Sequence, residues 1–138
     1  MHWWHELEKP KGIRSRCSDD SAWLAFVLYE YVVKTGDMDI LQYETPYLHS
    51  PPLSDHEQER YEIAQSDLKE PIILHAFRGI ERTFRTGSHG LCLMGSGDWN
   101  DGMNIVGKKG RGESVWLAFF SAITAQRLAK LFVLVNDD

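Results

Sequence analysis

The sequence predicts an all-α fold in which helices are joined by long glycine-rich loops. Apolar residues recur at helical spacing in three stretches, residues 18–35, 66–86 and 114–135. No stretch alternates apolar and polar residues over the length that a half-buried strand requires. Glycine, asparagine and aspartate gather between these stretches, above all in residues 88–112.

The residues ahead of the first helix combine aromatic and charged side chains. On a helix, His2 and His5 could share a metal ion, but no third ligand is evident nearby, and an aromatic cluster that packs or faces a ligand is the more usual interpretation. Residues 13–16 alternate, so Arg14 and Arg16 would point the same way if the backbone is extended.

The first helix is predicted to begin at Ser18, a typical N-cap residue, and to end at Gly36. Asp19 and Asp20 would then lie in the first turn, where negative charge stabilises the helix dipole. Two explanations of these acids are equally good: helix capping alone, or a ligand-binding role for at least one of them. The helix is apolar on nearly all sides, which favours burial between other helices.

The second helix is predicted to begin at Ser66 or Asp67, with Pro71 in its first turn, and to end at Gly87. The charged stretch before it, residues 57–65, is interpreted as a solvated connector. The third helix is expected to open at the Glu-Ser pair 113–114.

The most unusual stretch is residues 95–104, Gly-Ser-Gly-Asp-Trp-Asn-Asp-Gly-Met-Asn. An indole can cover the apolar face of a pyranose, and carboxylates can bind or protonate its oxygens. Glycine, asparagine and aspartate also favour an ordinary turn. A plain turn needs neither Trp99 nor two acids as close as Asp98 and Asp101, so we interpret the stretch as a sugar-binding loop.

Composition narrows the class of protein. A chain of 138 residues with 43% hydrophobic and 25% charged residues is typical of one soluble globular domain. The net charge of −5 argues against a nucleic-acid partner, whose binding surface is basic. The longest apolar run, residues 115–125, is shorter than the roughly 18 residues that cross a bilayer, so this segment is not expected to span a membrane. Cys17 and Cys92 fit no metal spacing and no disulfide framework, which favours a reducing, cytoplasmic location.

The loop 95–104 and the run Gly-Arg-Gly-Glu-Ser-Val-Trp-Leu at 110–117 closely resemble the glycosyltransferase-36-type phosphorylases of glycoside hydrolase family 94. The runs at 2–5 and 14–24 look most like the branch that includes cyclic β-1,2-glucan synthases, whose parent proteins can be attached to the inner membrane. The resemblance implies an (α/α)₆ barrel with a sugar site built by loops at one end. It also implies reversible, inverting phosphorolysis of a β-glucosidic bond, with a β-1,2-glucan as the expected substrate. Inorganic phosphate would be the co-substrate, with no cofactor and no metal.

The resemblance also implies roles for individual residues. Asp101 matches the general acid of the family. Trp99, with its neighbours Asp98 and Asn100, would shape the sugar site around it. Asp19 and Asp20 match positions that bind the donor glucosyl unit in the family, and Asp20 is favoured for this role. Arg14 and Arg16 would contact the sugar.

Residues 1–138 are expected to form a fragment of a larger (α/α)₆ catalytic domain. The phosphate-binding segment of the family has no counterpart in the sequence, so the isolated chain is expected to be inactive and to associate through exposed apolar faces. The expected partner is a β-linked gluco-oligosaccharide or glucan. Two alternatives stay open: a glucan-binding module without turnover, and a structural fragment whose motif is a relic.

Overall fold

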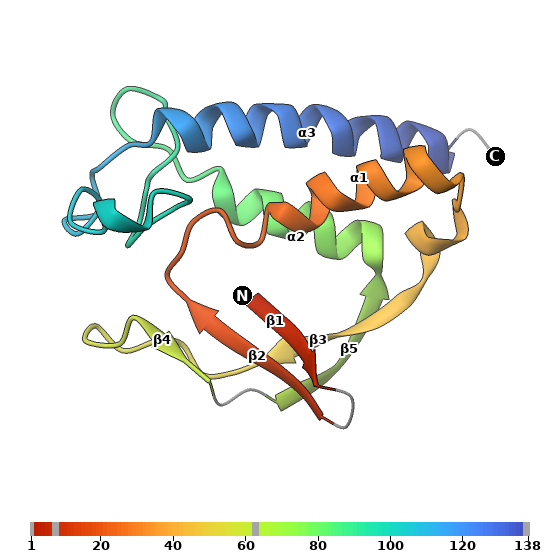
Figure 1. Ribbon diagram of the computed structural model, residues 1–138, viewed down its shortest axis with the longest axis horizontal. Helices are drawn as coiled ribbons and strands as arrows, with labels where there is room; N and C mark the ends of the chain where they lie inside the picture. The colour runs from red at the N-terminus through yellow and green to blue at the C-terminus, as the bar shows by residue number, and fades with distance from the viewer. Residues whose placement is uncertain (1, 7–8, 62–63, 137–138) are drawn as a thin grey trace.

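The computed structural model describes residues 2–6, 9–61 and 64–136, with three α-helices and two small antiparallel sheets among them. The helices lie side by side, and the strands lie to one side of them (Figure 1). The helices are α1 (Trp23–Thr35), α2 (Ile72–Thr83) and α3 (Val115–Asn136). One sheet has the order β1 (His2–Glu6), β2 (Lys9–Ser15) and β4 (Glu59–Arg60). The other pairs β3 (Glu44–His49) with β5 (Ala64–Pro71), and two short 3-10 helices are η1 (Asp39–Gln42) and η2 (Asp101–Met103).

The helices enclose the main apolar core. It contains buried side chains from all three helices and from η1, namely Ala25, Leu28, Val32, Leu41, Ile73, Ala76, Ile80, Leu128 and Leu131. The predicted end of the first helix is confirmed, because Gly36 has φ of 72° and its N–H donates to the Val32 carbonyl at 2.8 Å. Glycine adopts this left-handed conformation without a steric penalty. Arg127 of α3 forms an ion pair with Glu30 of α1 at 2.9 Å, which adds a polar contact at the edge of the core.

The purely all-α prediction was wrong at the segments that form the sheets. Residues 66–71, predicted to begin the second helix, belong to β5, and α2 begins only at Ile72 and ends at Thr83. Most positions of β5 are exposed, so neither face of the two-stranded ribbon carries the apolar alternation that reveals a strand in a sequence. His2 and His5 lie in β1, not on a helix, and their side chains lie outside the described part of the chain.

Polar contacts attach the β3–β5 ribbon to α2. The Tyr47 hydroxyl of β3 donates to Glu70 of β5 at 2.5 Å, and its ring stacks on His75 of α2 at 3.7 Å. Arg78 of α2 donates two hydrogen bonds to the same Glu70 carboxylate, at 2.6 and 2.7 Å. Burial and the adjacent Glu70 carboxylate raise the pKa of Tyr47 to about 12, so this hydroxyl remains a donor at neutral pH.

The third helix has the length and apolar composition of a membrane span between Val115 and Val135. The expectation that no segment is long enough considered only residues 115–125. The same composition is found in core helices of soluble proteins, and α3 buries Leu117, Leu128 and Leu131 against the rest of this chain. The helix therefore gives only weak evidence about membrane insertion.

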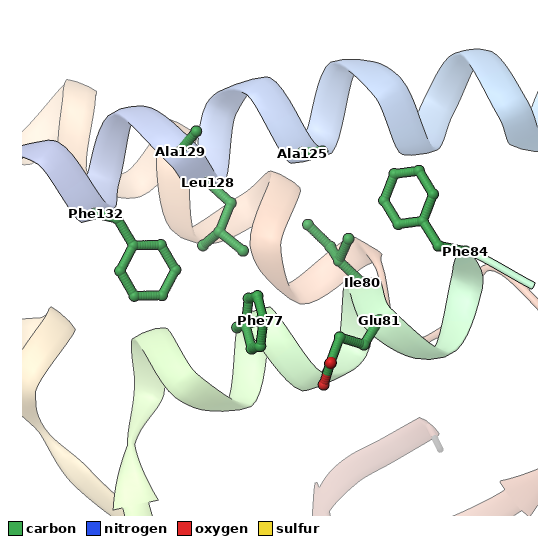
Figure 2. Close-up of a pocket in the computed structure, with 8 residues that line it drawn as sticks. All are labelled: Phe77, Ile80, Glu81, Phe84, Ala125, Leu128, Ala129 and Phe132. Atoms are coloured by element: carbon green, nitrogen blue, oxygen red, sulfur yellow. The ribbon is translucent and has the colours of Figure 1, made fainter.

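Several large apolar side chains remain exposed on the helices. On the outer sides of α1 and α3 they are Leu24, Val27, Tyr31, Val33, Phe119, Ile123, Val133 and Leu134. A hollow of about 480 Å³ also opens between α2 and α3, where Phe77 and Phe132 face each other and Phe84 lines the opposite end (Figure 2). Exposed apolar area on this scale favours contact with other protein surfaces.

We therefore predict that the 138-residue chain associates in solution. Multi-angle light scattering should give a mass above the 15.9 kDa of one chain. Val27→Glu and Phe119→Glu, which place a charge on exposed positions of α1 and α3, should shift the distribution toward the monomer. A monodisperse monomer of the unmodified chain would contradict the prediction.

Candidate functional site

The loop 95–104 is docked against the turn that leads into α1. The Ser18 amide donates to the Gly97 carbonyl at 3.0 Å, and its hydroxyl lies 2.8 Å from the Met94 carbonyl and 2.9 Å from the Gly97 carbonyl. Cys17 and Gly95 form an antiparallel bridge beside this contact. Ser18 is therefore not a helix cap. Its predicted capping role was wrong because its hydroxyl is used in this contact between distant segments.

The two acids after Ser18 lie in a turn, not in a helix. The Ala22 amide donates to the Asp19 carbonyl, and α1 starts one residue later, with no acid in its first turn. The prediction that Asp19 and Asp20 complement the helix dipole was therefore wrong. Of the two explanations for these acids, helix capping is therefore excluded and ligand binding remains.

Helix α2 supports this turn from behind. The Ser21 hydroxyl donates to the Gly79 carbonyl at 3.0 Å, and the Thr83 hydroxyl lies 3.3 Å from the Ser18 carbonyl. A Cβ atom at Gly79 would lie 2.3 Å from the Ser21 carbonyl oxygen. Glycine at this position therefore allows the acidic turn to approach the α2 backbone. A glycine inside a predicted helix was the only sequence signal for this contact.

Asp19 is buried between the turn and the loop. Its carboxylate accepts a hydrogen bond from the Trp23 indole at 3.0 Å, and the Trp23 ring lies 5.9 Å from that of Trp99. Burial raises the pKa of Asp19 above 3.8, the indole N–H opposes that shift, and the charges of Asp20 and Asp98 add to it. Trp23 thus connects the Asp19 carboxylate to the loop that carries Trp99.

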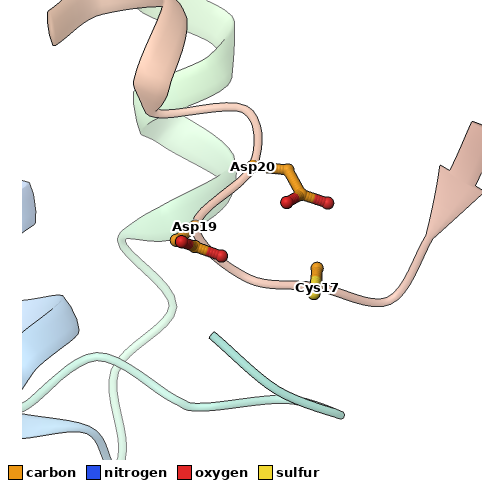
Figure 3. A group of neighbouring side chains, drawn as sticks. All are labelled: Cys17, Asp19 and Asp20. Carbon is orange, nitrogen blue, oxygen red and sulfur yellow. The ribbon is translucent and has the colours of Figure 1, made fainter. Parts of the chain in front are cut away.

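Asp20 is only partly buried and accepts a hydrogen bond from the Ser15 hydroxyl at 2.7 Å. Cys17, Asp19 and Asp20 offer potential ligand atoms that all lie within 4.8 Å of one another (Figure 3). Carboxylates and thiolates at such distances can hold a cation, but acids also gather without one. Since Trp23 and Ser15 already donate to these carboxylates, the cluster does not by itself identify a metal site.

Asp98 is 1% exposed, and both of its carboxylate oxygens accept hydrogen bonds within this chain. One carboxylate oxygen accepts from the Asn100 amide at 2.8 Å and from the Asn100 side-chain amide at 2.9 Å. The other accepts from the Ser114 hydroxyl, which in turn accepts from the Leu117 amide at 3.0 Å. Ser114 therefore caps α3, which confirms the predicted start of the last helix.

Trp99 is the outermost member of an aromatic row. Its side chain is 67% exposed and stacks on Trp116 of α3, with ring centroids 6.4 Å apart and an interplanar angle of 21°. Trp116 stacks on Phe120 at 5.1 Å, and Phe120 contacts Trp23 at 4.5 Å. The row fixes the exposed indole from behind, so its outer side is available to the apolar face of a sugar ring. Sequence reasoning did not select Trp116 or Trp23, whose helical spacing is also that of core residues.

Asp101 begins η2 directly after Asn100. Its side chain lies outside the described part of the structure, so its assignment as general acid stays a prediction from the motif. Its backbone position is nevertheless defined by its neighbours, because Asp98 holds Asn100 through both its backbone and its side-chain amide.

The profile of the glycosyl hydrolase 94 superfamily catalytic domain matches residues 3–138. The chain belongs to this superfamily. A cyclic β-(1,2)-glucan synthase of Rhizobium meliloti (strain 1021) is 39% identical over 126 residues, which cover 90% of this chain and 4% of that protein. A solabiose phosphorylase of Paenibacillus borealis is 32% identical over 110 residues, 77% of this chain and 12% of that protein. A 3-O-β-D-glucopyranosyl-β-D-glucuronide phosphorylase of the same organism is 62% identical over 42 residues, 29% of this chain and 6% of that protein.

The superfamily and these relatives support a carbohydrate-active domain of the phosphorylase type. The chain spans between 4% and 12% of the length of the three relatives. It therefore covers only a small part of each of them.

In this glycosyl hydrolase 94 segment Arg14, which lies in β2, and Arg16, which follows that strand, hold another part of the chain. Arg14 donates to the hydroxyl and carbonyl of Ser50 at 2.9 and 2.7 Å. Arg16 donates to the carbonyls of Glu57 at 2.8 Å and Ser54 at 2.7 Å. The extended backbone predicted here is present up to Ser15. These donors fix the segment 50–57 beside the strand, and the expected contact of Arg14 and Arg16 with sugar stays a prediction.

The raised pKa of Asp19 gives a prediction about pH. Because the pKa of the folded state lies above 3.8, the stability that protonated Asp19 contributes is fully present below pH 3.8 and is lost as pH rises through the folded pKa. Asp19→Asn removes the ionised form and keeps an acceptor for the Trp23 indole. The unfolding free energy of the variant relative to the unmodified chain should therefore increase from about pH 4 to about pH 7. Urea denaturation at both pH values measures it, and an equal difference at both would contradict the prediction.

Proposed function

We propose that this chain carries the part of a glycoside phosphorylase domain that binds a β-linked gluco-oligosaccharide and protonates its leaving oxygen. The observation that supports the proposal best is the docking of the loop 95–104 on the acidic turn. The contact between Trp23 and Trp99 and the bonds from Ser18 to Gly97 bring the exposed indole of Trp99 close to the turn that holds the Asp19 carboxylate. An indole and carboxylates together suit a sugar ring, which has an apolar face and a rim of hydroxyl groups.

In the proposed reaction, Trp99 covers one face of a glucosyl unit and Asp20 accepts hydrogen bonds from its hydroxyls. Asp101 donates its proton to the glycosidic oxygen as the bond from that oxygen to C1 breaks. A phosphate oxygen attacks C1 from the opposite face, so the products are glucose 1-phosphate with inverted configuration and the shortened saccharide. An inverting hydrolase needs a second carboxylate to activate water, whereas phosphate is already a nucleophile and needs no such base.

The proposed acid must hold its proton near neutral pH, which requires a raised pKa. The buried carboxyl group of Asp98 lies three positions before Asp101 in the same loop. A neighbouring negative charge disfavours ionisation of a second carboxyl, so Asp98 would act in the required direction. We further propose that the three helices form part of an (α/α)₆ barrel and that the substrate is β-1,2-linked, as in the product named for the Rhizobium meliloti relative. We also propose that the protein segment is located in the cytoplasm.

Phosphate dependence tests this proposal. A protein that carries this segment within a complete domain is incubated with β-1,2-linked gluco-oligosaccharides, with and without phosphate, and glucose 1-phosphate is measured. Release that requires phosphate is the expected result. Saccharide binding without release of glucose 1-phosphate would instead show a binding module, and the absence of both would exclude the proposed function.

A further inference from the structure

We propose that Asp98 is a positioning residue that connects the loop around Trp99 and Asp101 to the first turn of α3 through Ser114. The proposal rests on the function proposed above for its effect on catalysis, whereas its structural part concerns the loop alone. The sequence had placed Asp98 among the sugar contacts, because an acid beside a tryptophan resembles a ligand. The contacts of its carboxylate point to a different role.

The first argument is that Asp98 has no free side toward a ligand. Its side chain is 1% exposed, and both carboxylate oxygens already accept hydrogen bonds, from Asn100 and from Ser114. A buried carboxylate with three donors is well compensated, since hydrogen bonds to a charged acceptor are stronger than neutral ones. A sugar hydroxyl would have to displace one of these donors to reach it.

The second argument is that the hydrogen bonds from Asn100 to Asp98 fix the position of the backbone that leads into Asp101. The Asp98 carboxylate accepts a hydrogen bond from the backbone amide of Asn100, two positions later, and this bond is the one by which an aspartate closes a local turn. The same oxygen also holds the Asn100 side chain, which prevents residue 100 from rotating independently. Trp99 lies at the tip of this turn, and Asp101 follows it directly. The orientation of both therefore depends on the Asp98 carboxylate.

The third argument is that Ser114 links this turn to a rigid element. Its hydroxyl has one proton, which it donates to Asp98, and its oxygen accepts the Leu117 amide at the start of α3. Leu117 is completely buried, so the first turn of α3 is a fixed support. The stacking of Trp99 on Trp116 is a second contact between the same two segments. Together they hold the loop in one place relative to α3.

The structural arm of the test uses the 138-residue chain and needs no activity. Amide hydrogen exchange is measured for the unmodified chain, Asp98→Asn, Ser114→Ala and Ser114→Thr. Asp98→Asn and Ser114→Ala should speed exchange of the Asn100 amide by about tenfold or more, because a hydrogen bond to a charged group stabilises by at least that factor. Ser114→Thr keeps the hydroxyl and should restore slow exchange. If Ser114→Ala speeds exchange at Leu117 but leaves Asn100 unchanged, Ser114 is only a helix cap and the proposal is overturned.

The catalytic arm uses the complete domain that carries this loop. Asp98→Asn should lower kcat for phosphorolysis by about tenfold or more, because the proton donor is misplaced, and KM should rise together with this loss, because Trp99 lies in the same turn. The double variant with Ser114→Ala should lose little more than Asp98→Asn alone, because both act through one contact. A rise in KM with normal kcat would show that Asp98 binds substrate directly, and would overturn the proposal. If the unmodified domain releases no glucose 1-phosphate, the proposed function fails, and the exchange measurements still decide the role of Asp98.

Discussion

Asp101→Asn, made in a complete domain that carries this loop, is expected to slow phosphorolysis by about 10²–10⁴-fold, the usual contribution of general acid catalysis. The amide keeps the size and shape of the carboxyl group but has no acidic proton to give to the leaving oxygen. Saccharide binding should survive, since an amide still forms hydrogen bonds. The measurement is release of glucose 1-phosphate from a β-linked gluco-oligosaccharide, with and without phosphate.

A substrate with a better leaving group separates the general acid from its neighbour. An aryl β-glucoside that releases an acidic phenol needs little protonation, so it should restore much of the activity of Asp101→Asn. It should not restore Asp98→Asn, in which the loop itself is displaced. The assignment would be reversed by near-normal turnover of the natural substrate in Asp101→Asn together with an inactive Asp98→Asn that the aryl substrate rescues.

The end of α1 and the start of α3 were predictable because their signals belong to the local sequence. The C-terminal glycine of α1 and the serine cap of α3 satisfy backbone groups within four residues, so their signals are local: Gly36 binds Val32, and Ser114 binds Leu117. The strands had no such signal. Residues 64–71 are held by pairing with β3 and by Glu70 contacts to Tyr47 and Arg78, which lie 23 and 8 positions away from Glu70 in the sequence.

The residues of the candidate site were found more readily than their roles. Ser18 has the hydroxyl of a helix cap but directs it to carbonyls of a distant segment, and Arg14 and Arg16 donate to carbonyls of residues 50–57. Asp98 and Asp101 are alike in sequence, both acids beside Trp99 and Asn100. Only the burial of Asp98 and its bond to Ser114 distinguish it from a ligand-facing acid. Local pattern identifies chemistry, whereas tertiary contacts decide which donor or acceptor remains available.

The loop depends on glycine at a place where two stretches of its backbone touch. A Cβ atom at Gly107 would lie 1.7 Å from the Gly95 carbonyl oxygen, and one at Gly112 would lie 2.2 Å from that of Val106. The φ angle of Gly107 is not positive, so a side chain at this position is excluded by lack of space and not by the backbone conformation. Because the obstructing atoms belong to the backbone, no side-chain rotation can relieve the clash.

Gly107→Ala is therefore expected to separate residues 95–97 from residues 106–107 and to destabilise the chain by about 1–3 kcal/mol or more, the usual effect of overpacking. Because the same stretch 95–97 binds Ser18, the loop should also leave the acidic turn, and saccharide affinity should fall with it.

Gly102→Ala is the matched control. Gly102 lies in the same loop, and its φ angle is not positive. A Cβ atom added there would have no other atom within 4 Å. The substitution should therefore leave stability unchanged or slightly improve it, because alanine restricts the unfolded chain. Thermal unfolding and saccharide titration compare the two variants. Equal melting of Gly107→Ala and Gly102→Ala would show that the two stretches of the loop are not in contact in solution, and the docked loop on which the candidate site depends would then be wrong.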